Sequence, residues 1–131
     1  MIFRVISGIL ALACFWAAYQ QFDDVDPARW ITTYIAAGVL GLLHAIGHPR
    51  QIASIGLAVI LLAWSGWVAR EFFSAVDSSD RGLMDALIGS WDEIRTIELR
   101  REMFGLLILG LWLAGIGVVS RRKPKASASA A

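Results

Sequence analysis

Carboxylates gather at two places in this sequence, and both places could bind a cation. The first is Asp23-Asp24-x-Asp26, and the second is Glu98-x-x-Arg101-Glu102. Glu98 and Glu102 are one helical turn apart, so a helix would present both carboxylates from one face. Converging carboxylate oxygens are the ligands that hard ions such as Ca²⁺ and Mg²⁺ prefer. An arginine beside them could instead make the cluster a structural ion-pair network.

We expect the two groups to meet in one cluster with a ligand-binding or structural role. Its predicted members are Asp23, Asp24, Asp26, Trp30, Tyr34, Glu98, Arg101 and Glu102. In the structural interpretation, Arg29 and Arg101 neutralise the aspartates and pin the first loop to the last helix. In the alternative, the cofactor is a divalent cation, and its candidate ligands are Asp24, Asp26, Glu98 and Glu102. No residue is assigned a catalytic role, because no evident nucleophile accompanies these carboxylates and arginines.

Two histidines form a weaker candidate site. His44 and His48 are also one helical turn apart, a spacing that can hold a metal, but two ligands are too few for a closed site. We therefore interpret them as polar residues at the membrane interface beside Arg50. The single cysteine, Cys14, excludes an intramolecular disulfide. The sequence contains neither a Gly-rich phosphate loop nor an HExxH zinc motif.

Four apolar segments must position these residues. They are Ile2–Tyr19, Trp30–Gly47, Ile52–Val68 and Met103–Ser120. Each is about 17–19 residues long, enough to cross a hydrocarbon core of ~30 Å. With 57% apolar residues and a mean hydropathy of +0.62, the chain predicts an all-α membrane protein, because backbone groups in lipid must be satisfied internally. We expect one four-transmembrane-helix bundle over residues 1–120 and a basic, disordered cytoplasmic tail over 121–131.

Charge patterning predicts the orientation of the bundle. If the N-terminus is cytoplasmic, all eleven acidic residues fall on the outer side, and Arg4, Arg50 and the basic run 121–125 fall inside. Aromatic residues then lie near the outer interface, where such rings prefer to sit: Trp16, Tyr19, Trp30, Trp64 and Trp67. We predict that both termini are cytoplasmic, in a bacterial inner membrane. The basic run suits anionic lipid headgroups better than nucleic acid.

Local signals predict how the second span begins and packs. Asp26 can cap the helix, Pro27 fits its first position, and Val25 can staple onto Trp30. Ala37, Gly41 and Ala45 form a ridge of small residues suited to close helix contact. The segment His48-Pro49-Arg50-Gln51 predicts a tight turn, because Pro49 cannot easily extend the preceding helix.

The segment 70–101 is amphipathic and charged. Leu83, Leu87, Trp91 and Ile94 recur at helical spacing. This spacing predicts a helix from about Gly82 that lies on the outer surface or leads straight into the last span. At the same spacing, the next position of the apolar stripe is Glu98. We expect this amphipathic segment to be the surface most suited to a protein partner.

The first acidic motif also resembles a known family. The pattern Gln21-x-Asp23-Asp24-x-Asp26-x-x-x-Trp30-x-x-x-Tyr34 is similar to the first-loop signature of the transmembrane protein 220 family, and Glu98-x-x-Arg101-Glu102-x-x-Gly105 is similar to its second element. Asp23 stands where the family usually has asparagine, and Val25 stands where it usually has proline. The resemblance implies small four-helix membrane proteins and brings no established activity.

These features favour a structural or interaction component of a membrane, with lipid as its surroundings and residues 70–101 as its docking segment. The alternative is a binding or transport module for a divalent cation or small ligand at the acidic cluster. A membrane enzyme that uses a carboxylate as general base is the least favoured reading.

Overall fold

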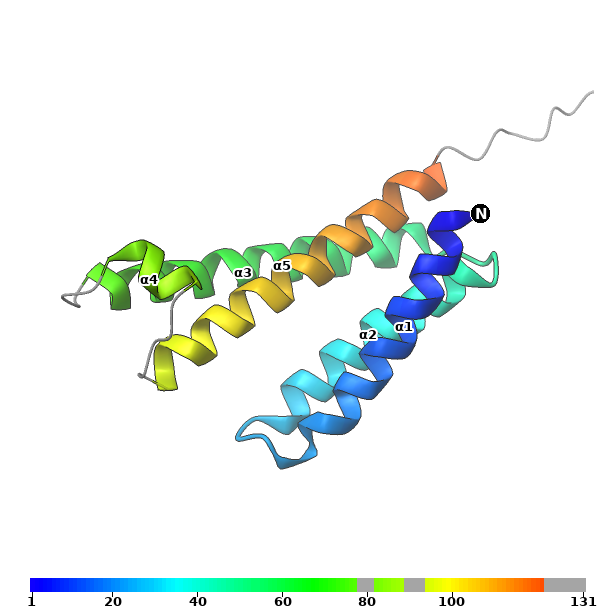
Figure 1. Cartoon of the computed structure of the whole chain (residues 1–131). Coiled ribbons are helices and arrows are strands. Elements are labelled where there is room, and N and C mark those ends of the chain that lie inside the picture. The colour runs from blue at the N-terminus through cyan, green and yellow to red at the C-terminus, as the bar shows by residue number, and fades with distance from the viewer. Residues whose placement is uncertain (78–81, 89–93, 122–131) are drawn as a thin grey trace, which may run out of the picture. The chain divides into compact units, whose positions relative to one another are not determined.

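The apolar segments form helices, as expected where lipid offers the backbone no hydrogen-bond partner. The computed structural model describes residues 1–77, 82–88 and 94–121 (Figure 1). Its elements are α1 (Ile2–Gln20), the short 3-10 helix η1 (Gln21–Asp23), α2 (Pro27–Ala45), α3 (Gln51–Asp77), α4 (Leu83–Ile88) and α5 (Ile94–Arg121). The predicted all-α class is therefore confirmed. Of the expected tail, only Arg121 belongs to the described residues.

Three of these helices are long and apolar enough to cross a membrane. The candidate spans are Ile2–Asp23, Gln51–Asp77 and Arg95–Arg121. The fourth expected span, α2, is 19 residues long but is not among them. Its first turns carry Arg29, Thr32 and Thr33, and its last turn carries His44, which lowers its mean hydropathy. The structure thus gives three candidate spans where the sequence predicted four.

The second half of the chain is more helical than the apolar pattern indicated. Helix α3 continues past Val68 to Asp77, and α5 begins at Ile94, well before Met103. Neither extension contains Gly or Pro, so nothing local ends the helix where the hydrocarbon ends. The helix expected from about Gly82 is present as the short α4. Trp91 of its predicted stripe lies outside the described residues.

The described residues divide into two compact units, 1–57 with 112–121, and those within Ala58–Leu111. In the first unit, α1 and α2 lie side by side and antiparallel (Figure 1). The face that α1 buries is made of small residues: Ser7, Ala11, Cys14 and Ala18. The expected single domain over 1–120 stays a prediction.

Helix α2 meets α1 with small residues of its own. Ala37 is fully buried, and a Cβ added to Gly38 would come within 2.9 Å of Cε1 of Phe15. At the other end of the pair, a Cβ on Gly8 would lie 3.5 Å from Cβ of Ala45. Small side chains allow the two backbones to approach closely, which is how helices associate in lipid. The predicted ridge therefore does make a helix contact, and Gly38 is a member of it that the spacing missed.

The end of α5 completes this unit. The indole of Trp112 lies directly over Gly41, where no side chain intervenes. Its Nε1–H donates a hydrogen bond to Oγ of Ser7 at 3.2 Å, and both groups are buried. An indole N–H in an apolar interior needs such an acceptor. Ser7, Gly41 and Trp112 thus join three helices at one point.

The second unit pairs the later part of α3 with the first part of α5. Ser65 Oγ donates to the backbone oxygen of Met103 at 2.9 Å, and a Cβ on Gly110 would come within 2.7 Å of Cγ of Leu62. A buried stripe along these helices supplies the packing: Leu61, Val68, Phe72 and Leu106. A close glycine contact and one buried hydroxyl hold this pair, as small and polar residues do between membrane helices.

Replacing Gly41 with alanine tests whether the indole of Trp112 packs directly on this position. Gly41→Ala should lower the free energy of unfolding by about 1–3 kcal/mol, because the new Cβ would overlap the indole ring. Gly56→Ala is the matched control, since its Cβ would meet nothing within 4 Å, and it should gain slightly from helix propensity. Detergent-solubilised protein unfolded by heat or SDS, followed by tryptophan fluorescence, gives both values. Equal stability of the two variants would contradict this packing.

Candidate functional site

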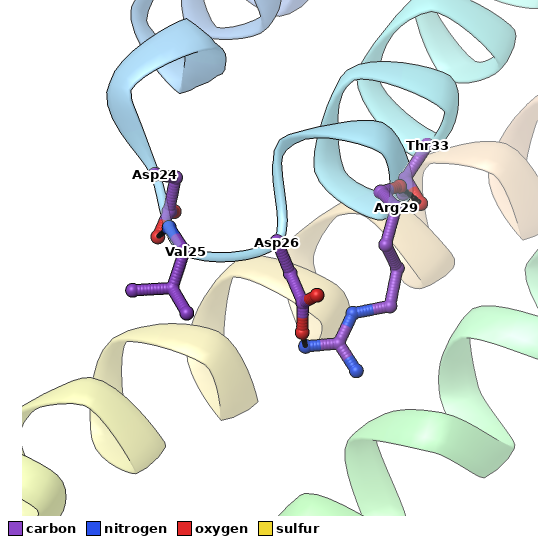
Figure 2. A network of polar contacts seen from close by, with 5 residues as sticks. All are labelled: Asp24, Val25, Asp26, Arg29 and Thr33. Carbon is purple, nitrogen blue, oxygen red and sulfur yellow. Dashed lines mark hydrogen bonds and ion pairs between the residues drawn. The ribbon is translucent and has the colours of Figure 1, made fainter.

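The first predicted acidic motif forms the loop between α1 and α2 (Figure 2). The N–H of Asp24 donates to the backbone oxygen of Gln21 at 3.1 Å. Its own Oδ1 accepts the N–H of Val25 at 2.7 Å. Asp24 therefore folds the loop locally, and one oxygen of its carboxylate is already in use.

Asp26 makes an ion pair where a helix cap was predicted. It is the residue before α2, and Pro27 stands at the start of that helix as expected. However, its side chain makes no capping hydrogen bond, and Oδ2 instead lies 3.5 Å from Nη2 of Arg29. The guanidinium one turn later competes for the carboxylate, and a charged partner makes the stronger contact. Val25 is 95% exposed, so the predicted staple onto Trp30 is also wrong.

The Asp26–Arg29 pair lies in the open. The two side chains are 67% and 46% exposed, respectively, and an exposed ion pair contributes about 0–1 kcal/mol. Arg29 also makes a ring contact: its Cζ lies 5.7 Å from the ring centroid of Trp30. The Trp30 ring in turn lies 6.1 Å from that of Tyr34. These predicted site residues thus come together as a charge and aromatic cluster at the start of α2.

The second acidic motif lies on α5. Glu98 and Arg101 are exposed, and Glu102 is half-buried. They belong to the unit Ala58–Leu111, whereas the first motif belongs to the other unit. Their convergence with Asp24 and Asp26 stays a prediction. Within 1–77, 82–88 and 94–121, no three His, Cys, Asp or Glu side chains are grouped so as to hold a metal ion.

The opposite end of the α1–α2 pair holds a feature that the sequence did not reveal. Arg4 Nε donates to the backbone oxygen of Ala45 at 3.0 Å, so a side chain of α1 caps the end of α2. Gly47 follows with φ +89°. Its N–H bonds to the oxygen of His44 at 3.1 Å, and the N–H of His48 bonds to that of Leu43 at 2.8 Å. This pair of bonds is the Schellman motif, which needs a left-handed residue and so favours glycine.

His44 and His48 do not share a helix face. Helix α2 ends at Ala45, so His48 lies beyond it and is exposed. His44 is only 5% exposed, and its ring packs edge-on against Phe3 with centroids 5.3 Å apart. The expectation that both histidines lie on one helix face is therefore wrong. The left-handed turn at Gly47, which separates the two residues, is the physical reason.

A cavity of about 160 Å³ opens beside these residues. Its lining comes from the ends of α1, α2 and α5 and from the turn after α2: Met1, Phe3, Arg4, His44, Gly47, Pro49, Val119 and Ser120. All of these belong to the first unit. Arg4 and His44 are the cavity's charged and titratable side chains. No motif joins them in the sequence, because they are brought together only by the pairing of α1 with α2.

The comparisons with known proteins identify the family. A family model described as transmembrane family 220, helix, matches residues 13–118. The chain belongs to this family. Both motifs that carried the resemblance lie within the matched residues, so that prediction is confirmed, and the protein is a multi-pass integral membrane protein of transmembrane family 220. No curated protein and no solved structure matches the chain.

Disulfide trapping tests whether the two acidic motifs meet. In a Cys14→Ser background, Asp26→Cys should cross-link to Glu98→Cys or Arg101→Cys under mild oxidation, because a disulfide forms only when the two Cα atoms come within about 7 Å. Asp26→Cys paired with Leu111→Cys, farther along α5, is the control. Gel mobility before and after reduction gives the readout. Equal or absent cross-linking at all three pairs would rule out the predicted cluster, in both its structural and its cation-binding forms.

Proposed function

We propose that this protein is a structural component of its membrane that crosses the bilayer four times and binds a protein partner outside it. Membership of transmembrane family 220 makes it a multi-pass membrane protein. The remaining elements of the proposal are the fourth span, the orientation and the partner-binding surface. The main observation in support of partner binding is that apolar side chains are exposed at the polar end of the second unit.

The pairing of α1 with α2 supports a fourth span. Each helix has 19 residues, or about 28 Å at 1.5 Å per residue. The two helices lie side by side along their length (Figure 1), with close contacts of Gly8 with Ala45 and of Phe15 with Gly38. A helix that accompanies a span over its whole depth lies at the same depth in the bilayer. Arg29 near its start can reach the interface by snorkelling.

The cavity at Arg4 supports an even number of crossings. It is lined by Phe3 and Arg4 at the start of α1 and by Val119 and Ser120 at the end of α5. Both helices are candidate spans, so these two ends lie at the same membrane face. Helices α1, α3 and α5 alone would make three crossings and separate the ends. A crossing by α2 removes this conflict.

Reporter fusions test the four-span topology and its orientation. Following the positive-inside rule, a C-terminal green fluorescent protein should fluoresce, and alkaline phosphatase at the same end should be inactive, if that end is cytoplasmic. An N-terminal fluorescent fusion should behave in the same way, and alkaline phosphatase inserted between Asp24 and Val25 should be active. Termini found on opposite sides would contradict the four-span proposal.

The apolar surface lies on a segment longer than a membrane requires. Helix α3 has 27 residues, about 40 Å, against a hydrocarbon core of ~30 Å. Its last turns carry Arg70, Glu71 and Asp77, which suit water or headgroups. On this same overhang Phe73 is 45% exposed, and Met84 on α4 is 66% exposed. Exposed apolar side chains within a polar segment favour an interaction site.

Polar contacts connect the helices that carry these side chains. Glu71 Oε2 lies 3.9 Å from Nη2 of Arg95, which connects the overhang of α3 to the start of α5. Arg100 Nη1 donates to the backbone oxygen of Leu87 at 3.4 Å, which connects α5 to the last turn of α4. The exposed Phe73 and Met84 are thus presented on connected helices.

Site-specific photocross-linking tests the partner surface. A benzoylphenylalanine at Met84 should give a discrete protein adduct in intact membranes, because that side chain faces outward from the polar segment. The same probe at Ile60, an exposed apolar residue in the middle of α3, is the lipid-facing control and should give no protein adduct. Lipid adducts alone at both positions would contradict partner binding. Purification in mild detergent that yields only the monomer, with no co-purifying protein, would also contradict partner binding.

A further inference from the structure

We propose that the cavity at Arg4 and His44 binds a phosphate oxyanion, supplied by the headgroup of an anionic phospholipid. The cavity lies at the opposite end of the α1–α2 pair from the acidic loop. Lipid binding there is independent of partner binding at the α3–α4 surface. It rests on the charge, burial, size and position of the cavity.

Arg4 supplies the positive charge. Its guanidinium has five N–H donors, and the Nε–H is held by the backbone oxygen of Ala45 at 3.0 Å. The Nη2 end lies against Gly47, 3.0 Å from where a Cβ would stand. Among residues 1–77, 82–88 and 94–121, no carboxylate forms an ion pair with Arg4. The exposed guanidinium is therefore anchored at its Nε and retains donors for an oxyanion, which a guanidinium can bind with two parallel hydrogen bonds.

His44 and the surrounding charges favour an anion. The imidazole is 95% removed from solvent, lines the same cavity and is held by Phe3. The three segments that build this end, 1–10, 44–54 and 112–121, contain no Asp or Glu. They do contain Arg50 and Arg121, and the sequence continues with further basic residues. The partial negative charges at the ends of α2 and α5 oppose an anion, so binding depends on Arg4.

The size and position of the cavity point to a headgroup. At about 160 Å³ it is smaller than the ~300–1,000 Å³ pockets that hold drug-sized molecules, so it suits a phosphate group. It opens where two candidate spans, α1 and α5, end, which is the depth of lipid phosphates. Met1 and Val119 in its lining are exposed and apolar, as expected beside acyl chains. Basic residues at this depth attract anionic lipids.

The test compares lipids within each variant. Full-length protein in detergent micelles is titrated with phosphatidylglycerol or phosphatidylcholine, and bound lipid is counted by native mass spectrometry alongside the melting temperature. For the wild type we expect phosphatidylglycerol to bind and to raise the melting temperature, and phosphatidylcholine to do neither. Arg4→Gln should weaken phosphatidylglycerol binding about tenfold or more, the loss expected for a hydrogen bond to a charged group.

Two further variants keep the test decisive. Arg50→Gln removes an exposed charge from the same end without touching the cavity lining, and it should bind phosphatidylglycerol like the wild type. Val119→Phe fills the cavity and leaves Arg4 in place, so it should lose binding even if Arg4→Gln folds poorly. Equal losses in Arg50→Gln and Arg4→Gln, or unchanged binding in Val119→Phe, would overturn the proposal. A thermal shift of the same size with inorganic phosphate alone would overturn the lipid as the source.

Discussion

The close approach of α1 and α2 is the constraint on which the first unit depends. Lipid gives no hydrophobic reason for two helices to associate, so their attraction must come from packing and from buried polar contacts. The small residues of α1, around Ala11 and Cys14, and those of α2, around Ala37 and Gly38, provide that packing. Because the backbones come so near, Gly41 can receive a whole indole ring. The same approach brings Arg4 within reach of the end of α2.

The two ends of this helix pair differ in their chemistry. At the loop end, Asp24 and Asp26 accept local partners, an N–H and the guanidinium of Arg29. At the other end, Arg4 reaches from one helix to the backbone of another, and a histidine is buried beside it. Arg4 thus contacts the end of α2 and also lines the cavity.

The helices could be predicted from the sequence because lipid imposes them, and the family could be predicted from two ordered motifs. The helix ends could not, since the runs around Arg70 and Arg95 contain no residue that stops a helix. The partner of Asp26 could not be predicted either. Its position before α2 predicts a helix cap, and Arg29 one turn later predicts an ion pair. The structure shows the ion pair. The cavity at Arg4 and His44 was beyond reach, because its members are neighbours only once α1 and α2 are paired.

The hydrogen bond between Ser7 and Trp112 has a consequence for biosynthesis. It joins residues 105 positions apart, so the serine leaves the ribosome long before its tryptophan exists. Until α5 has entered the membrane, the hydroxyl must turn back to a carbonyl of its own helix, as such groups do in apolar surroundings. The slot above Gly41 likewise remains open to lipid during that interval. Helix α5, synthesised long after α1 and α2, is therefore the one that closes the packing of the first pair.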